Sequence, residues 1–128
     1  MQVAKLFADS GMISLCSFIS PCTADRDRVR ARLQPGQFIE VYMRVPLSVC
    51  EARDPKGLYA KVRAGKLKGM TGINDLYEEP SNAELIIDAA DPRTGLLRSP
   101  EVQAAQILAY LEDNNYLCVN LPQMQAMG

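Results

Sequence analysis

The sequence predicts an α/β domain in which parallel strands form a sheet that is flanked by helices. Three segments have the composition of short buried strands, residues 12–18, 37–43 and 84–88, and helical patterns separate them. Strands that alternate with helices favour a parallel sheet, because each parallel pair needs a crossover connection. The 128 residues fit one domain, and 48% apolar with 23% charged residues is typical of a folded globular chain.

The N-terminal part of the chain predicts a helix, a strand and a second helix. An amphipathic pattern that stops at Gly11 indicates the first helix. The apolar run MISLCSF, residues 12–18, predicts a strand that is buried on both faces. Asp25 is a candidate N-cap for a helix over residues 26–33, which ends before Pro35.

Proline positions and capping residues predict the remaining elements. After the strand at 37–43, Pro46 is suited to be the first residue of a short helix over residues 46–53, and a further helix is expected over residues 56–64. Ser99 is a candidate N-cap, followed by proline, for the last helix. Its core face is expected to carry four apolar residues at three-residue steps, Val102, Ala105, Leu108 and Leu111.

Composition excludes several kinds of site. The chain has no histidine, so imidazole is absent as a base or metal ligand, and its four cysteines include no C-x-x-C pair, so no zinc site is expected. Cys16 and Cys50 lie in apolar segments and are expected in the core. The formal net charge of −1 and the lack of a long apolar run predict neither nucleic acid nor a membrane as partner.

A basic stretch between Asp54 and Asp75 is the most informative part of the sequence. Five cations and no acid lie between these two aspartates, and Gly65, Gly69 and Gly72 interrupt the second half of the stretch. Such a loop suits a small polyanionic ligand, because Lys supplies point charges and Gly lets backbone N–H groups approach phosphate or sulfate. A solvated helix face followed by a loop is an equally simple interpretation. The cations are Lys56, Lys61, Arg63, Lys66 and Lys68.

An RNA-binding module is a further interpretation of the same stretch. Residues 69–72, GMTG, match the G-x-x-G loop of a KH module, but the flanking elements differ and basic and aromatic residues are not interleaved. A second candidate site is Ser20, at the end of the predicted strand, where open α/β sheets bind ligands. Ser20 could instead cap a local turn, and without histidine it is disfavoured as a nucleophile.

Together, these motifs resemble the C-terminal half of the adenylylsulfate kinase family, over a region from about Val3 to about Leu117. The resemblance implies a P-loop kinase fold and a role in sulfate activation, in which the γ-phosphoryl group of ATP passes to the 3′-hydroxyl of adenylylsulfate to give 3′-phosphoadenylylsulfate and ADP. The matching motifs, in order, are FISP (18–21), ADRD (24–27), FIEVYM (38–43), VCEARDPKGLYAKVRAGKLKG (49–69), TGIND (71–75) and YEEP (77–80).

The chain also departs from the family pattern. The phosphate loop G-x-x-x-x-G-K-[ST] occurs nowhere in the 128 residues, and neither does a segment similar to D-G-D-N-x-R-H-G, which in the family holds a candidate catalytic Asp. Cys22 and Met70 stand where the family usually has aromatic residues. We therefore expect residues 1–128 to be a partial kinase domain, truncated at its N-terminus and inactive alone. Mg²⁺ accompanies ATP, and its ligands are expected in the missing part. No metal ligand is expected among residues 1–128.

The resemblance assigns roles to residues of this chain. It places Ile19, Ser20, Lys56 and the pair Gly69-Met70 against adenylylsulfate, and Ser20 also matches a phosphoserine position of bacterial members, although P-loop phosphoryl transfer is normally direct. It implies that residues 54–75 form a lid that closes over both nucleotides. Beside the lid, Arg53 matches an arginine that packs on the adenine of ATP. The residues of the lid that are expected near the nucleotide phosphates are Lys61, Arg63, Lys66 and Lys68.

The family resemblance also implies binding partners, and alternative functions are kept beside it. The expected partners are adenylylsulfate and ATP, a homodimer is left open, and the expected location is the cytoplasm, or a plastid if a targeting segment precedes the sequence. A non-catalytic regulatory module that binds a sulfonucleotide is the main alternative. An RNA-binding module that uses the basic lid is a weaker one.

Overall fold

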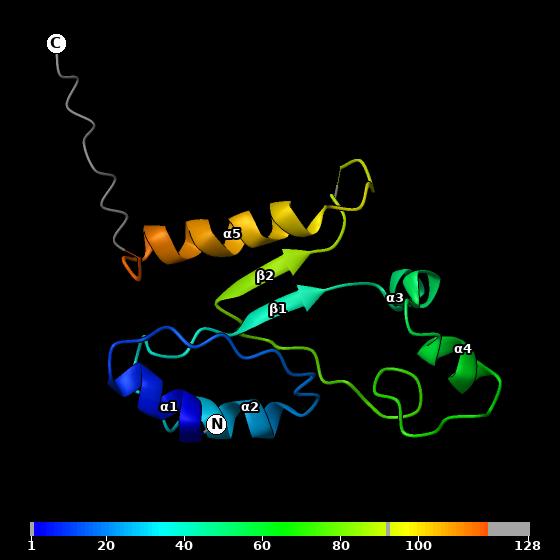
Figure 1. The fold of residues 1–128 in the computed structure, drawn as a ribbon, viewed down its shortest axis with the longest axis horizontal. Coiled ribbons are helices and arrows are strands. Elements are labelled where there is room, and N and C mark those ends of the chain that lie inside the picture. Colours follow the sequence, from blue (N-terminus) through cyan, green and yellow to red (C-terminus); the bar gives the residue numbers. More distant parts are fainter. Residues whose placement is uncertain (1, 92, 118–128) are drawn as a thin grey trace, which may run out of the picture.

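A two-stranded parallel sheet forms the centre of the computed structural model, which describes residues 2–91 and 93–117. Strand β1 (Val41–Arg44) pairs with strand β2 (Leu85–Asp88) in a register that places Val41 opposite Leu85 and Arg44 opposite Asp88. Helix α5 (Pro100–Asp113) packs on β2, as Figure 1 shows, and Ile87 of β2 is fully buried. The predicted α/β class with parallel strands is confirmed.

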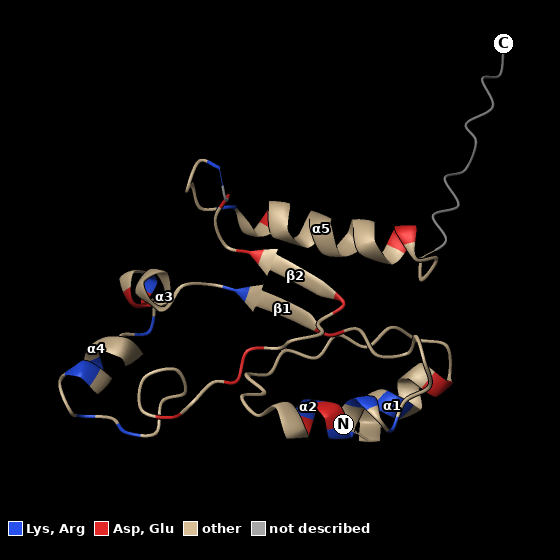
Figure 2. Cartoon of the chain, turned by 180° about the vertical axis from the view of Figure 1, so that it is seen from behind, with Lys and Arg blue, Asp and Glu red and all other residues tan. Residues whose placement is uncertain are grey.

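Four shorter helices surround this sheet. In Figure 1, α1 and α2 lie below the strands, while α3 and α4 lie beyond the carboxyl end of β1. The view from behind in Figure 2 shows the same separation. Their bounds are α1 (Gln2–Asp9), α2 (Thr23–Arg30), α3 (Leu47–Arg53) and α4 (Leu58–Arg63).

The strand predicted over residues 12–18 does not form. This segment has no strand partner within the described residues, and its apolar side chains face solvent, with Leu15 85% and Phe18 73% exposed. The predicted strand is therefore wrong. An apolar pattern alone does not make a strand, because a strand forms only where a neighbouring strand satisfies its backbone groups. The expectation for Cys16 is wrong for the same reason: its side chain is exposed, whereas Cys50 is half-buried.

Helix α2 starts three residues earlier than predicted, and Asp25 is not its N-cap. Cys22 occupies the N-cap position without a side-chain hydrogen bond. The carboxylate of Glu78 takes over the capping role and accepts from the Thr23 N–H at 2.6 Å. Asp25 lies in the first turn, where it pairs with Arg28 on the surface at 3.1 Å. A contact that is distant in sequence thus decides where this helix begins.

The structure confirms the predicted N-cap of the last helix but not its predicted buried face. The Ser99 hydroxyl accepts from the Val102 N–H at 3.4 Å, and Pro100 is the first helical residue. Of the four expected core residues only Leu111 is buried, while Val102, Ala105 and Leu108 are exposed. A three-residue step drifts around a helix of 3.6 residues per turn. The less exposed side follows the true period instead, through the half-buried Gln103, Ile107 and Tyr110 to the buried Leu111.

The remaining boundaries shift by a few residues. Strand β1 begins at Val41 rather than at residue 37 and ends at Arg44, one residue past the predicted segment, because it forms only where it pairs with β2. Pro46 is the N-cap of α3 rather than its first residue. Gly57, at a φ of +63°, is the N-cap of α4, so this helix begins at Leu58 and not at residue 56.

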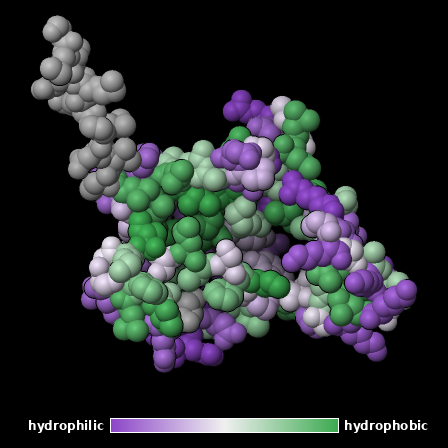
Figure 3. Space-filling model, in the orientation of Figure 1, coloured by the Kyte–Doolittle hydropathy of each residue, from purple (hydrophilic) through white to green (hydrophobic). Residues whose placement is uncertain are grey.

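The apolar core of the described residues is small. It contains four buried apolar residues, whereas many large apolar side chains of the described residues are exposed. Figure 3 shows apolar side chains gathered on the surface over α1, and Val3 and Leu6 of this helix are both exposed. The buried residues are Val62, Ile87, Ala89 and Leu111.

Candidate functional site

Ser20 lies in a strained turn that leads into α2. Its φ is +44°, in the left-handed region that residues with a Cβ usually avoid, at a cost of about 1–3 kcal/mol. The Ser20 carbonyl accepts a hydrogen bond from Arg26 Nη1 at 2.6 Å, which holds the turn in this conformation. Ile19, beside it, is exposed. The turn thus presents Ile19 to solvent from a fixed backbone.

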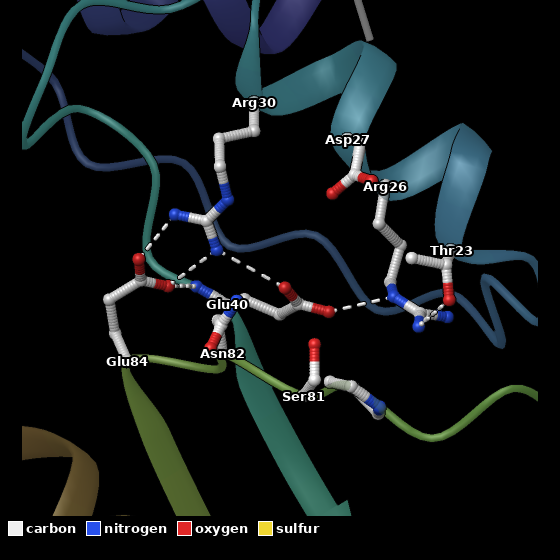
Figure 4. A pocket seen from close by; sticks show the side chains of 9 residues that line it. Thr23, Arg26, Asp27, Arg30, Glu40, Ser81, Asn82 and Glu84 are labelled. Atoms are coloured by element: carbon white, nitrogen blue, oxygen red, sulfur yellow. Dashed lines mark hydrogen bonds and ion pairs between the residues drawn. The ribbon is translucent and has the colours of Figure 1, made fainter.

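Arg26 is the residue that organises this turn, and sequence reasoning did not single it out. Its side chain is 8% exposed, and Nη2 donates to the Thr23 hydroxyl at 3.0 Å and to the Glu78 carbonyl at 2.8 Å. Its Nε forms an ion pair with Glu40 Oε1 at 2.8 Å, and this buried oxygen has no hydrogen-bond partner among the described residues. A guanidinium can serve several acceptors at once because its five N–H donors are fixed in one plane. Figure 4 shows Arg26 between α2 and the start of β1.

A second arginine extends the network along α2. Arg30 Nη2 lies 2.9 Å from Glu84 Oε2 and 3.1 Å from Glu40 Oε2, and Arg30 Nη1 also pairs with Glu84 (Figure 4). The Glu40 N–H donates to Glu84 at 2.7 Å. The hydrogen bonds from Arg30 hold the pKa of Glu84 below its ordinary value, against the opposing effect of burial. These charges line a cleft of about 310 Å³ and neutralise one another, so the network braces the fold.

The network predicts that the free energy of unfolding decreases at acidic pH. Because the folded-state pKa of Glu84 lies below its ordinary value of 4.5, its contribution is present above about pH 4.5 and is lost as the pH falls through the folded-state pKa. We expect Glu84→Gln to lower the free energy of unfolding by about 1 kcal/mol at pH 7, a modest value because Arg30 is partly exposed, and by less at pH 3. Urea unfolding at both pH values measures this. Glu112→Gln, at an exposed position on α5, is the control; equal losses for Glu84→Gln at both pH values would contradict the assignment.

Lys56 stands at the tip of a tight turn between α3 and α4. The Asp54 carbonyl accepts from the Gly57 N–H at 3.0 Å, which closes the turn. The Asp54 carboxylate accepts from the N–H groups of Tyr59 at 3.1 Å and Ala60 at 3.0 Å, and these bonds, Ala60's first, hold the pKa of Asp54 below its ordinary value. One aspartate therefore ends α3 and caps α4, and Lys56 projects from a defined, exposed position.

The other basic residues of this region lie on two helices and the loop that follows. Arg53 ends α3, Lys61 and Arg63 lie in the last turn of α4, and Lys66 and Lys68 lie in the loop. Figure 2 shows these cations spread along α4 and this loop. Arg63 pairs with Glu51, whereas the other four form no ion pair with any residue that the structure describes. Their charges are therefore not neutralised by the protein.

The loop ends in a compact turn around Met70. Gly69 has a φ of +72°, a conformation that residues with a Cβ rarely adopt. The backbone conformation therefore explains why glycine occupies this position. The Met70 carbonyl accepts from the N–H groups of Ile73, Asn74 and Asp75, at 3.1, 2.9 and 3.2 Å. Met70 is half-buried. The turn is thus closed by three hydrogen bonds to one carbonyl.

The structure joins the Ser20 turn to the chain that follows this loop but not to the cations themselves. The Glu78 N–H donates to the Pro21 carbonyl at 2.9 Å. Within residues 2–91 and 93–117, no hydrogen bond or ion pair connects Ile19 or Ser20 with the basic residues of 53–68. Figure 1 shows the loop that leads into α2 at the end of that helix nearer to α4. The two groups of predicted site residues are therefore not joined by any hydrogen bond or ion pair in the described part of the chain.

The described part of the chain has neither a cluster of metal ligands nor a membrane-spanning helix. No group of three or more Cys, Asp or Glu side chains there could hold a metal ion. No helix of that part is long and apolar enough to cross a bilayer. The residues present thus provide no carboxylate cluster for Mg²⁺.

Comparison with known proteins identifies the family. The family model for adenylylsulphate kinase matches residues 1–88. Adenylyl-sulfate kinase 3 of Arabidopsis thaliana is 50% identical over 116 residues, which are 91% of this chain and 54% of that protein. The adenylyl-sulfate kinase of Shewanella halifaxensis is 58% identical over 89 residues, 70% of this chain and 43% of that protein.

A solved structure agrees with these sequence matches. The Mycobacterium tuberculosis APS kinase in complex with AMPPNP and APS superposes with a TM-score of 0.73 at 39% identity, over 87% of this chain and 61% of that one. The chain thus spans about half the length of the curated relatives it matches. Its parallel strands and flanking helices are part of the P-loop kinase fold. On sequence and structure together, the chain belongs to the adenylylsulfate kinase family.

Proposed function

We propose that this protein serves the adenylylsulfate kinase reaction, in which the γ-phosphoryl group of ATP passes to the 3′-hydroxyl of adenylylsulfate. The observation that carries the proposal is the 50% identity over 91% of the chain to a protein named adenylyl-sulfate kinase. The structural neighbour, which was solved with AMPPNP and APS, supports a nucleotide and a sulfonucleotide as ligands. The part of the reaction that falls to residues 1–128 is recognition of adenylylsulfate and neutralisation of phosphate charge.

Residues 54–75 are proposed as the lid, and the Ser20 turn as the surface it closes on. Ile19, Ser20 and Lys56 contact adenylylsulfate in this proposal, with Gly69-Met70 covering its purine. The support is physical: the Ser20 turn is preorganised, and Lys56 is exposed at the tip of a hydrogen-bonded turn, with no ionic partner among the residues that the structure describes. The residues proposed to meet nucleotide phosphates or the adenine are Arg53, Lys61, Arg63, Lys66 and Lys68.

ATP and Mg²⁺ belong to the proposed reaction, but the residues of this chain do not fit a complete site for them. The 128 residues contain no G-x-x-x-x-G-K-[ST] loop, and the described residues hold no carboxylate cluster. A P-loop cradles the β- and γ-phosphates with backbone N–H groups, and its Ser or Thr binds the metal ion. We therefore assign no phosphoryl-transfer step to these residues, and Ser20 is proposed as a binding residue.

The missing phosphate loop also favours a second candidate function, a non-catalytic module that binds a sulfonucleotide and regulates another enzyme. The two functions share the adenylylsulfate site and differ in turnover. The location we propose is the cytoplasm or a plastid, since two of the Arabidopsis relatives are named chloroplastic. A homodimer remains part of the proposal.

Lys56 gives the sharpest test of the site. We propose a chimera in which the part of Arabidopsis adenylyl-sulfate kinase 3 that precedes its matched region is joined to residues 1–128. Loss of a charge-assisted contact costs about 1.5–3 kcal/mol, or roughly 10- to 150-fold in affinity. We expect Lys56→Ala to weaken adenylylsulfate by this factor and to leave ATP nearly unchanged, as measured by calorimetric titration.

The control for this titration is Lys5→Ala, because Lys5 lies on α1 and its one ion pair within the described residues is with Asp9, at 2.7 Å. It should change neither affinity. Small and equal effects of Lys56→Ala on both nucleotides would show that Lys56 is a solvated charge and not part of the site.

A further inference from the structure

We infer that Arg26 is a positioning residue. It holds the Ser20 turn and the segment around Glu78, which follows the lid, in one fixed arrangement. The inference rests on the proposed function, in which Ser20 and the lid bind adenylylsulfate. Arg26 donates to the carbonyl of Ser20 at 2.6 Å and to the carbonyl of Glu78 at 2.8 Å. These two residues are far apart in sequence, and one side chain holds both.

Burial and charge show that Arg26 is built into this place. It is the buried charged residue of the described chain, 8% exposed, and its charge faces Glu40 at 2.8 Å. A buried guanidinium is tolerated only where its charge and its donors are matched. Its hydrogen-bond acceptors are two backbone carbonyls and one hydroxyl, and its charge is balanced by the ion pair with Glu40. Most of its hydrogen bonds therefore depend on where the backbone lies.

Two further hydrogen bonds join the same segments. The Glu78 N–H donates to the Pro21 carbonyl at 2.9 Å, and the Thr23 N–H donates to the Glu78 carboxylate at 2.6 Å. Glu78 follows the lid segment 54–75 by only three residues. A displacement of the lid is therefore passed directly to the turn that holds Ser20.

The strain at Ser20 explains why this bracing matters for binding. A φ of +44° is unfavourable for serine, and the hydrogen bond from Arg26 to its carbonyl offsets that cost. Without Arg26 the turn would relax, and Ile19 and Ser20 would lose their fixed orientation. Binding sites lose affinity and rate when positioning residues shift by as little as about 1 Å.

Helix α2 supplies a matched control. Arg28 lies two residues after Arg26 on the same helix, is 65% exposed, and pairs only with Asp25. Arg26→Lys retains a charge opposite Glu40 but lacks the planar fork that reaches several acceptors at once. It should therefore fold even if Arg26→Met does not.

Hydrogen–deuterium exchange of residues 1–128 tests the bracing. In Arg26→Lys and Arg26→Met we expect the amides of Thr23 and Glu78 to exchange at least about tenfold faster than in the wild type. The Ala89 amide, which donates to the Arg44 carbonyl in the sheet, should keep its rate. Arg28→Met should leave all three unchanged. Unchanged rates at Thr23 and Glu78, or equal increases in the sheet, would overturn the inference.

Titration of adenylylsulfate into the chimera separates positioning from a purely structural role. Arg26→Lys should weaken adenylylsulfate roughly tenfold and leave ATP unchanged, while Arg28→Met changes neither. Faster exchange without weaker binding would overturn the positioning role. A wild-type chimera that does not bind adenylylsulfate would refute the proposed function instead, and the exchange rates would still decide whether Arg26 couples the two segments.

Discussion

Residues 1–128 alone are expected to form no measurable 3′-phosphoadenylylsulfate from ATP and adenylylsulfate. Phosphoryl transfer depends on positioning and on stabilisation of charge at the transferred group, and the cradle that supplies both is the phosphate loop that these residues lack. Uncompensated cations such as Lys61 and Lys66 cannot replace a ring of aligned N–H donors. An assay of ADP and 3′-phosphoadenylylsulfate formation measures this.

The control for this assay is the fold of the same sample. Cooperative urea unfolding of residues 1–128 shows that the polypeptide is folded under assay conditions, so that inactivity reports on chemistry. Turnover at a rate ordinary for kinases, about 1–100 s⁻¹, would contradict the prediction and would require a different phosphate-binding element within the chain.

Residues 1–128 are also expected to self-associate at micromolar concentration. Leu15 and Phe18 lie in an extended segment with no strand partner among the described residues, and the two-stranded sheet leaves backbone groups free at its edges. Exposed apolar segments and open edges pair with other chains. Light scattering coupled to size-exclusion chromatography should show dimers or larger species.

A charge in the exposed segment should reverse this association. We expect Leu15→Lys to shift residues 1–128 towards the monomer, because a lysine in such a segment opposes pairing. Leu96→Lys, at an exposed position in the loop before α5, serves as the control and should not change the distribution. A wild-type chain that is monomeric and melts cooperatively would show that its apolar surface is not an association site.

The parts of the fold that could be predicted from sequence are those that local chemistry determines. Ser99 followed by proline sets the start of α5 through one short-range hydrogen bond. The strand segment 84–88 contains β2, and the segment 37–43 contains all of β1 except Arg44, because both segments are apolar and separated by a crossover. The run at 12–18 has the same composition, yet it stays extended without pairing, because strand formation depends on a neighbour that composition does not reveal.

The candidate site divides in the same way. The lid cations could be found from sequence because they are adjacent in the chain and uninterrupted by acids. Arg26 could not, because its significance comes from Ser20, Glu40 and Glu78, which only the folded chain brings together. The available signal was indirect: ADRD and YEEP both belong to the motifs shared with the family, and the structure explains this by a contact between them.

The rate of 3′-phosphoadenylylsulfate formation by the chimera tests the central claim most directly. If residues 1–128 carry the adenylylsulfate side of a kinase site, adding the phosphate-loop half should produce turnover within about 1–100 s⁻¹ that Lys56→Ala reduces. A chimera that folds cooperatively and binds ATP but forms no 3′-phosphoadenylylsulfate would contradict the claim and favour the regulatory module.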